Sequence, residues 1–373
     1  EETLEKLASD KSKHVRYSVI SNPVCYKIRK IWEKLSEDTD EDIRSYIAFR
    51  TSDIELQKKL SEDESETVRE NVLINQHNRA EIRAWIVQNS SKESMIFSVL
   101  DKFDWPDETL MELIDNLPKK IRLYIAENLT VSEVVLRKLA DDLWEEIRMV
   151  IAQKTSISHD MRTKLAEDPC DKVRLAIAQN PNTDQSTKAK LAGDTWEKVR
   201  LVIAQDSDTD QGTLVKLADD PCEKVRVAVA ENPNTDQITA IKLAEDISAK
   251  VRVAVAKRHD MNAKNLMKFA DSELDEVRLA VVNNPNSKNK IFVKLAKDVC
   301  PEIREKVARR TDNRDIREEL SYDEEEKVRL AVARGWGTGK RTLERMARDD
   351  ESQDVRLTAR ATVITWFKPP YHC

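Results

Sequence analysis

Glycine and aromatic residues are scarce in this chain. Only five of its 373 residues are glycine, and phenylalanine, tryptophan and tyrosine together make up 5% of the sequence. Glycine is the residue that tight hairpin turns most often require, so a fold rich in β-hairpins is not expected. Charged residues reach 35%, a composition that favours an all-α protein.

Long apolar segments are also missing. No run of eighteen apolar residues occurs, and the first residues, "EETLEKLASD", have neither the basic start nor the apolar centre of a signal peptide. We therefore expect a soluble, cytoplasmic protein that does not insert into membranes. The formal charge of −6 gives no overall attraction to nucleic acid, so any basic site must be local.

Cysteine is present five times, but not in a metal-binding pattern. No CxxC motif occurs, and Cys25 and Cys373 lie near opposite ends of the sequence. Cys170, Cys222 and Cys300 lie at the same or the adjacent position at the start of helix B in different repeats. Cys170 and Cys222 are two repeats apart, so they would lie roughly 20 Å apart if stacked helices are spaced about 8–10 Å. We expect no metal site and no cofactor, and the unpaired pattern fits a reducing compartment.

The chain consists of repeats. A Val-Arg or Ile-Arg pair recurs, and from Ile121 to Ile303 its spacing is always 26 residues. A further unit fits between Val68 and Ile121, where "SKESMIFSVL" replaces the pair, which gives fourteen repeats. We predict a single continuous solenoid over residues 1–373, with irregular repeats at about 76–120, regular repeats at about 121–307 and terminal repeats at 308–373.

Each repeat is predicted to contain two short helices, A and B. Helix A is expected to begin at a threonine such as Thr183 or Thr235, used as an N-cap, and to run to "KLA". Helix B is expected to have Asp168 as its N-cap and Pro169 as its first residue. The "NP" dipeptide after helix B predicts its end, because proline disfavours a helical residue before it.

Neither helix could bury enough apolar surface alone. In helix B, Val173, Ala176 and Ile177 form one apolar face, and small Ala178 allows a neighbouring helix to approach closely. Stacking of repeats would bury these faces. The predicted fold is therefore an all-α, right-handed α-solenoid in which each unit contacts only its neighbours.

The motif "LAxDPxxxVRxAVAxNPNT" resembles the variant leucine-rich repeat (LRV) of bacterial proteins, and "D…VR..A" is similar to the second helix of a HEAT repeat. The resemblance covers nearly the whole chain and is strongest from Ile121 to Val307. It implies a curved superhelical scaffold without a common catalytic activity. The cysteines that precede the repeats in an LRV protein with an iron–sulfur cluster are not found in this sequence.

An aspartate stands six residues before most of the repeated arginines. Eleven such aspartates are too many for one catalytic site, and the HEAT resemblance implies an Asp–Arg ladder between successive repeats. The alternative is an exposed row of arginines that binds a ligand. The predicted ladder in the regular repeats contains Asp168, Arg174, Asp194, Arg200, Asp220, Arg226, Asp246 and Arg252.

Two departures from the repeat suggest binding sites. The first lies in the irregular repeats, where Trp85, Met95, Phe103 and Trp105 are candidate partner-binding residues; the alternative is a degenerate repeat that has repacked. The second is a basic ridge near the ends of the later B helices, where cations also suit the helix dipole. Its candidate residues are Lys257, Arg258, Arg309, Arg310 and Arg334.

The segment "GWGTGK", Gly335 to Lys340, superficially resembles a phosphate-binding loop. A Walker A motif would need glycine at position 334 and serine or threonine at position 341, but Arg334 and Arg341 occupy these positions. We therefore expect an irregular loop between two helices.

No set of nucleophile, base and orienting residue stands out, so no catalytic residue is predicted. The favoured function is a non-enzymatic scaffold that binds a protein or peptide partner along its concave groove. The alternative is a nucleic-acid-binding solenoid, including a HEAT-like DNA-repair protein; a DNA glycosylase is a minor candidate. No small-molecule substrate is evident.

Overall fold

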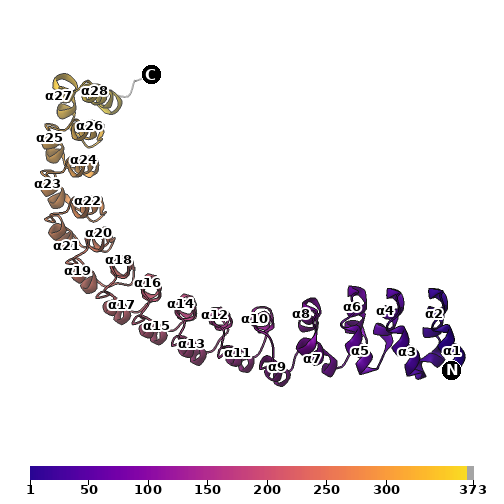
Figure 1. Cartoon of the computed structure of the whole chain (residues 1–373). Helices are drawn as coiled ribbons and strands as arrows, with labels where there is room; N and C mark the ends of the chain where they lie inside the picture. Colours follow the sequence, from indigo (N-terminus) through magenta and orange to yellow (C-terminus); the bar gives the residue numbers. More distant parts are fainter. Residues whose placement is uncertain (368–373) are drawn as a thin grey trace. The chain divides into compact units, whose positions relative to one another are not determined.

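The computed structural model describes residues 1–367, and in this range every regular element is helical. Twenty-eight α-helices and one short 3-10 helix, η1 (Pro23–Lys27), follow one another without a β-strand. The prediction of an all-α chain built from two-helix repeats is confirmed. The helices form two compact units, one from Glu1 to Asn182 and one that begins at Thr183. Each unit contains seven repeats (Figure 1).

In unit 1 the odd-numbered helices are helices A and the even-numbered helices are helices B. The A helices are α1 (Glu2–Leu7), α3 (Arg29–Leu35), α5 (Ile54–Leu60), α7 (Ala80–Asn89), α9 (Asp107–Ile114), α11 (Glu133–Leu139) and α13 (His159–Leu165). The B helices are α2 (Lys13–Ile20), α4 (Glu41–Arg50), α6 (Glu66–Ile74), α8 (Glu93–Lys102), α10 (Lys119–Asn128), α12 (Glu145–Gln153) and α14 (Asp171–Gln179).

Unit 2 repeats the same order. Its A helices are α15 (Gln185–Leu191), α17 (Gln211–Leu217), α19 (Gln237–Leu243), α21 (Ala263–Phe269), α23 (Asn289–Leu295), α25 (Arg314–Leu320) and α27 (Lys340–Asp349). Its B helices are α16 (Glu197–Gln205), α18 (Glu223–Glu231), α20 (Ala249–Lys257), α22 (Asp275–Asn283), α24 (Pro301–Arg310), α26 (Glu326–Arg334) and α28 (Gln353–Phe367).

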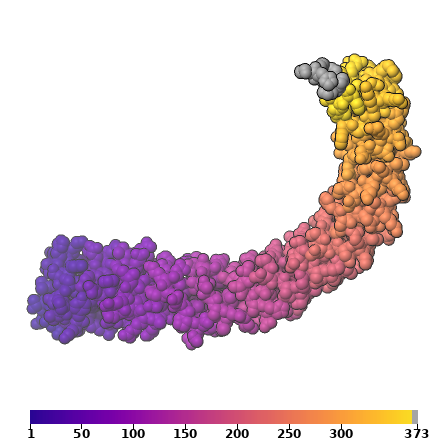
Figure 2. Space-filling view, turned by 180° about the vertical axis from the view of Figure 1, so that it is seen from behind, coloured from indigo at the N-terminus to yellow at the C-terminus, as the bar shows by residue number. Residues whose placement is uncertain are grey.

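The A and B helices of each unit form two layers. In unit 2 the B helices line the inside of the arc along which the repeats stack (Figure 1). The sequence colours follow one another in bands along each unit, so neighbouring repeats in the sequence are neighbours in space (Figure 2). The core lies between the layers, where the predicted core residues Val173 and Ile177 are fully buried. This is the arrangement expected when short helices bury their apolar faces by stacking.

The predicted N-cap of helix A is wrong by one residue. In α19 the N-cap is Asp236, whose Oδ1 accepts a hydrogen bond from the Thr239 amide at 2.7 Å. Thr235 instead donates its hydroxyl to the carbonyl oxygen of Val229 at 2.6 Å. In α15, likewise, Asp184 is the N-cap in place of Thr183. The threonine closes the end of helix B, and the aspartate after it opens helix A.

The predicted start of helix B is also too early. The N-cap of α14 is Cys170, and Asp168 lies two residues before it, accepting the Cys170 amide at 2.8 Å. The Asp168 carboxylate also accepts two hydrogen bonds from Arg148 of the preceding repeat, at 2.6 and 2.9 Å. This aspartate therefore shapes the turn before the helix and holds an arginine, so it is not the N-cap.

None of the helices within residues 1–367 combines the length and the apolar character needed to cross a membrane. The single continuous solenoid over the whole chain stays a prediction. Its terminal segment, 308–373, includes residues 368–373, which lie outside the described residues.

Candidate partner-binding surface

The repeated arginine of helix B contacts two successive repeats. In α18, Arg226 donates from Nε and Nη2 to the two carboxylate oxygens of Asp246, at 2.7 and 3.1 Å, just before the next B helix. Its Nη1 donates to the carbonyl oxygen of Asp220 in its own repeat at 2.7 Å. The Arg226 and Asp246 side chains are only 13% and 8% exposed. A planar guanidinium with several donors suits this forked contact.

These contacts change the pKa values of both partners. Burial alone would raise the pKa of Asp246, but the hydrogen bonds from Arg226 and from the Ser248 amide lower it below its ordinary value. The hydrogen bond with Asp246 raises the pKa of Arg226. Both side chains are therefore charged over the physiological pH range, and their attraction is little screened because they are mostly buried.

The same contact recurs in both units. Each pair joins the arginine of one B helix to the aspartate that precedes the next B helix. The pairs are Arg16–Asp38, Arg44–Asp63, Arg122–Asp142, Arg148–Asp168, Arg200–Asp220, Arg226–Asp246, Arg278–Asp298, Arg304–Asp323 and Arg329–Asp350. Arg252 differs, because Ser272 stands where an aspartate would be, and its Nη1 contacts the carbonyl oxygens of Asp246 and Ile247. Arg174 donates to the Asp168 carbonyl oxygen at 2.8 Å.

A second connection between repeats was not predicted from the sequence. At the end of α18, the Asn232 side-chain amide donates to the carbonyl oxygens of Ala204 and Asp206 in the preceding repeat, at 2.8 and 2.9 Å. Asn75, Asn180 and Asn284 make the corresponding contacts. The recurring "NP" was visible, but we interpreted it only as a helix end. These asparagines satisfy carbonyl groups that the last turn of a helix leaves free.

Two residues of the predicted basic ridge occupy this asparagine position. Arg258 is 8% exposed and donates to the carbonyl oxygens of Ala230, Asn232 and Thr235, each at 2.7–2.8 Å. It also pairs with Asp260 at 2.9 Å. Arg258 therefore does not lie on an exposed ridge, because its guanidinium is used to join two repeats.

Arg310 reaches back in the same way, to the carbonyl oxygens of Val282 and Asn284, and burial lowers its pKa. Lys257, Arg309 and Arg334 are exposed at the ends of their helices, but Arg309 is paired with Glu305. The ridge therefore presents fewer unengaged cations than the sequence suggests, and this weakens the case for nucleic-acid binding.

The candidate residues of the irregular repeats do not form one exposed surface. Met95 is buried in the core of α8, while Trp85, Phe103 and Trp105 are half-buried. The Arg83 guanidinium carbon lies 3.8 Å from the centre of the Phe103 ring. The Trp105 indole nitrogen is buried without a hydrogen-bond acceptor among the described residues. Met95 is accounted for by packing, and the role of the three aromatic residues stays a prediction.

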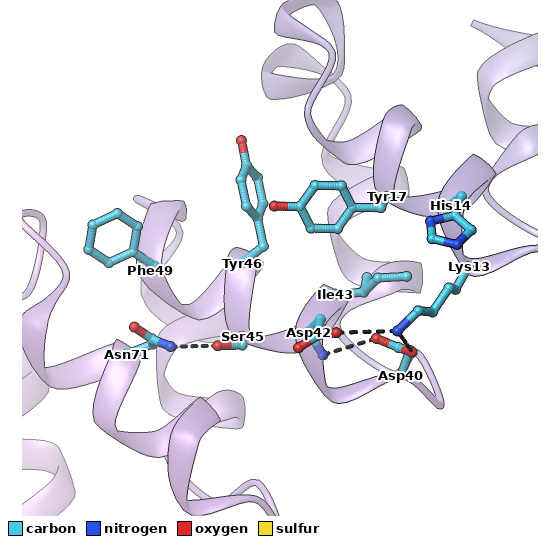
Figure 3. A pocket seen from close by; sticks show the side chains of 10 residues that line it. All are labelled: Lys13, His14, Tyr17, Asp40, Asp42, Ile43, Ser45, Tyr46, Phe49 and Asn71. Atoms are coloured by element: carbon cyan, nitrogen blue, oxygen red, sulfur yellow. Dashed lines mark hydrogen bonds and ion pairs between the residues drawn. The ribbon is translucent and has the colours of Figure 1, made fainter.

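A more open aromatic site lies on the B helices at the start of unit 1, and the sequence did not reveal it. Tyr17 of α2 and Tyr46 and Phe49 of α4 line a pocket of about 530 Å³ (Figure 3). Tyr17 and Phe49 are 41% and 40% exposed. The rings of Tyr17 and Tyr46 meet edge to face, with centroids 5.4 Å apart. We call this the aromatic pocket.

Polar groups fix the rim of the aromatic pocket. Lys13 lies 3.2 Å from Asp40 and 3.3 Å from Asp42, and these contacts raise the pKa of Lys13. On the opposite side, Asn71 of α6 donates a hydrogen bond to the Ser45 hydroxyl (Figure 3). The rim therefore offers hydrogen-bonding groups from three B helices around an apolar centre.

Tyr46 is held in one orientation by its neighbours. Its hydroxyl lies 3.1 Å from the hydroxyl of Tyr26. Burial and this hydrogen bond raise the pKa of Tyr46 to about 12, so the phenol stays neutral at physiological pH. A neutral tyrosine fixed at a pocket wall provides an apolar ring and a polar end to a ligand.

Aromatic residues continue along the B helices of unit 1. Phe97 of α8 and Tyr124 of α10 stack with ring centroids 4.2 Å apart, and the Tyr124 hydroxyl donates to Asp101. At the positions that correspond to Phe97 and Tyr124, α16 of unit 2 has Leu201 and Val202. The last two B helices of unit 1, α12 and α14, also hold non-aromatic residues there, so the aromatic residues at these positions are confined to the earlier B helices of unit 1.

The described cysteines, Cys25, Cys170, Cys222 and Cys300, are free thiols. Within residues 1–367, no three histidine, cysteine, aspartate or glutamate side chains come together as metal ligands. Cys373 lies outside the described residues.

Paired helices stacked in two layers, with side chains that bridge successive pairs, define both units as α-helical repeat structures. Neither the protein-family models nor the curated proteins give a match. Among solved structures, the chain is similar to a leucine-rich repeat variant with a novel repetitive structural motif, at 21% identity over 63% of this chain and 88% of that one, with a TM-score of 0.48.

It is also similar to a chain in the structure of the Pds5–Scc1 complex, at 15% identity over 99% of this chain and 68% of that one, with a TM-score of 0.30. A designed armadillo repeat protein in complex with a (KR)4 peptide shares 15% identity over 76% and 98% of the two chains, with a TM-score of 0.11.

Proposed function

We propose that this protein is a non-enzymatic scaffold that binds a partner protein through an extended peptide segment lying across the B helices of unit 1. The observation that carries the proposal is the aromatic pocket, where Tyr17, Tyr46 and Phe49 leave ring surface open to solvent. Exposed aromatic side chains gathered in a depression are typical of binding hot spots.

The segment that fits this pocket presents an apolar side chain to the three rings. Tyrosine and phenylalanine lose little conformational entropy on binding and provide a large contact area, so they bind apolar groups well. The Asn71 and Ser45 side chains lie beside the rings and offer hydrogen bonds to a peptide backbone. Repeated parallel helices present such groups at regular intervals, which suits an extended ligand.

The titratable groups of the aromatic pocket support binding rather than catalysis. Lys13 pairs with Asp40 and Asp42, so it is held as a cation and is not a free base. A catalytic site needs a nucleophile held against a base, and the lysine of this rim is instead paired with two carboxylates.

A peptide-display selection against the intact protein tests the proposal. We expect the selected peptides to share an apolar side chain at one position. Their Kd should rise about tenfold or more in Phe49→Ala, which corresponds to a loss of about 1.4 kcal/mol of binding free energy. Tyr322→Ala removes an exposed tyrosine of unit 2 and is the matched control, for which no change is expected.

Thermal unfolding followed by circular dichroism should show that both variants remain folded. Selected peptides that bind Phe49→Ala and Tyr46→Ala as tightly as the unaltered protein would place the binding site elsewhere. A selection that enriches no peptide would also contradict the proposal.

A further inference from the structure

Helix α25 carries a buried arginine that lacks an ionic partner. Arg317 is 2% exposed; its Nε donates to the Thr311 carbonyl oxygen at 2.8 Å, and its Nη1 donates to the Thr338 hydroxyl at 3.2 Å. No carboxylate of residues 1–367 lies within ion-pair distance of this guanidinium. Burial of a charge is costly and lowers the pKa of Arg317, and the nearby charge of Asp312 offsets this only in part.

The same unit contains a matched position in which the buried cation is neutralised. Lys188 is the fourth residue of α15, as Arg317 is of α25, and it is equally buried. Its ammonium group lies 2.7 Å from Asp206 and 3.4 Å from Asp208, both in the turn that follows α16. The buried charge of Lys188 is therefore balanced by carboxylates. Arg162, the fourth residue of α13, is less buried and donates to the carbonyl oxygen of Ile157 instead.

The aspartates that pair with Lys188 correspond to glycines in the repeat of Arg317. The turn "DSDTD", residues 206–210, aligns with "GWGTG", residues 335–339, so each of its three aspartates becomes a glycine while the threonine is kept. The third aspartate, Asp210, caps α17 through the Thr213 amide. Gly339 begins α27 without any side-chain cap. Both the buried cation and the helix N-terminus have therefore lost their carboxylates together.

Glycine also leaves room for the guanidinium and for a ligand beside it. A Cβ atom at Gly335 would come within 1.6 Å of Arg317 Nη1, so the arginine occupies the space of a missing side chain. A pocket of about 630 Å³ opens here, lined by Arg317, by further cations and by Trp336, which is 82% exposed. The other cations that line it are Arg309, Arg310, Arg314 and Lys340. Arg309 pairs with Glu305 and Lys340 with Glu344, so the positive charge of the pocket comes mainly from the arginines without an ion pair within residues 1–367. We call this the glycine-lined pocket.

We propose that the glycine-lined pocket binds a phosphate group, which supplies the negative charge that the three glycines have removed. Arginine guanidinium groups match phosphate oxygens with paired hydrogen bonds, and an uncapped N-terminus of the ten-residue helix α27 favours an anion. Arg314 and Arg317 line the pocket and supply positive charge for an anion. This site lies in unit 2 and does not depend on the aromatic pocket.

The test measures binding of inorganic phosphate and of phenyl phosphate to the intact protein by isothermal titration calorimetry, with chloride at equal ionic strength as the control. Arg317→Gln is the main variant, because Gln57 holds the corresponding position in α5 and donates to the Thr51 carbonyl oxygen. This substitution should therefore preserve the fold. Gly339→Asp is the second variant, because it restores the carboxylate found at Asp210 and its Cβ would come no closer than 3.7 Å to a neighbouring atom.

We expect phosphate to bind the unaltered protein and both variants to bind about tenfold or more weakly, because each removes or neutralises the charge that attracts the anion. Lys188→Gln, at the position that already has its carboxylates, should leave phosphate binding unchanged. Similar affinity for both ligands would indicate free phosphate, and tighter binding of phenyl phosphate would indicate a phosphate carried on a larger molecule that also contacts Trp336; either result supports the site.

The proposal is overturned if the unaltered protein binds neither ligand at millimolar concentration, or if folded Arg317→Gln binds as tightly as the unaltered protein. If Arg317→Gln does not fold, Gly339→Asp decides the outcome, and undiminished binding in that variant overturns the site. Binding of an oligonucleotide without terminal phosphates, in the absence of binding to either small ligand, would also overturn it.

Discussion

Replacing Arg226 by alanine removes one connection between two regular repeats and leaves Asp246 without its cation. Four donated hydrogen bonds of 2.7–3.3 Å are lost, two to the Asp246 carboxylate and one each to the carbonyl oxygens of Asp220 and Pro221. Hydrogen bonds to charged groups contribute about 1.5–3 kcal/mol. Loss of one partner of a fully buried ion pair costs about 3–5 kcal/mol.

The size of the expected effect follows from how buried the pair is. The Arg226 and Asp246 side chains keep 13% and 8% exposure, and the Ser248 amide still donates to Asp246. Water can therefore reach the orphaned carboxylate in part. We expect Arg226→Ala to lower the free energy of unfolding by about 2–3 kcal/mol. Arg226→Lys keeps the charge but not the forked geometry, so its free energy of unfolding should lie between those of Arg226→Ala and the unaltered protein.

The assay must report on individual repeats, because repeat proteins do not always unfold in one step. Urea unfolding gives the overall change, and amide hydrogen exchange locates it, with the largest loss of protection expected in α18 and α20. A double-mutant cycle with Asp246→Ala measures the coupling directly. A stability change below about 0.5 kcal/mol, or additive single mutants, would refute the reasoning.

The stabilisation that Arg226 and Asp246 provide is expected to depend on pH. The pKa of Asp246 is lowered in the folded protein, so its stabilising contribution is complete above the unfolded pKa of about 3.9 and is lost as the pH falls through the folded value. The difference in unfolding free energy between Arg226→Ala and the unaltered protein should therefore shrink below about pH 4. A difference that is constant from pH 7 to the acid transition would argue against an ionic contribution.

Three further changes have expected outcomes. Asn232→Ala should lower stability by about 1–3 kcal/mol, measured by urea unfolding, because two buried carbonyl groups of the preceding repeat lose their donor. Lys188→Met should cost about 3 kcal/mol, because the part-buried Asp206 loses its cation, and adding Asp206→Asn should restore most of that loss. Trp105→Ala should weaken partner binding more than folding if the irregular repeats hold the partner; a large drop in melting temperature with unchanged Kd would show packing alone.

The periodic features of the fold could be predicted from the sequence. The Val-Arg pair and the aspartate before it recur at a constant spacing. A guanidinium and a carboxylate that share this spacing are expected to form an ion pair between successive repeats. Arg200 and Arg226 do contact Asp220 and Asp246 in this way. The order of helices followed from the same period, because short amphipathic helices must stack to bury their apolar faces.

Features that need three-dimensional geometry were less accessible. Thr235 and Asp236 are adjacent, and both are N-capping types, so only the backbone shows which side chain reaches the first amides. Arg258 was interpreted as surface because an arginine in a last helical turn suits the dipole, yet it fills an asparagine position. Tyr17 and Phe49 occupy different positions in their repeats, so the aromatic pocket leaves no periodic signal.

The connections between repeats also bear on how the length of such a chain can change. Each regular B helix carries an arginine that contacts the next repeat and is followed by an asparagine that contacts the preceding repeat, as Arg226 and Asn232 show. Each regular repeat therefore contributes one side chain to the joint on either side of it. Removing or duplicating a whole 26-residue unit brings an arginine to an aspartate and an asparagine to free carbonyl groups once more. A single inserted residue between Arg226 and Asn232 would rotate one of them by about 100° around the helix and break a joint. Gene duplication and loss in steps of one repeat are therefore tolerated by the chemistry of the joints, whereas small insertions are confined to the turns.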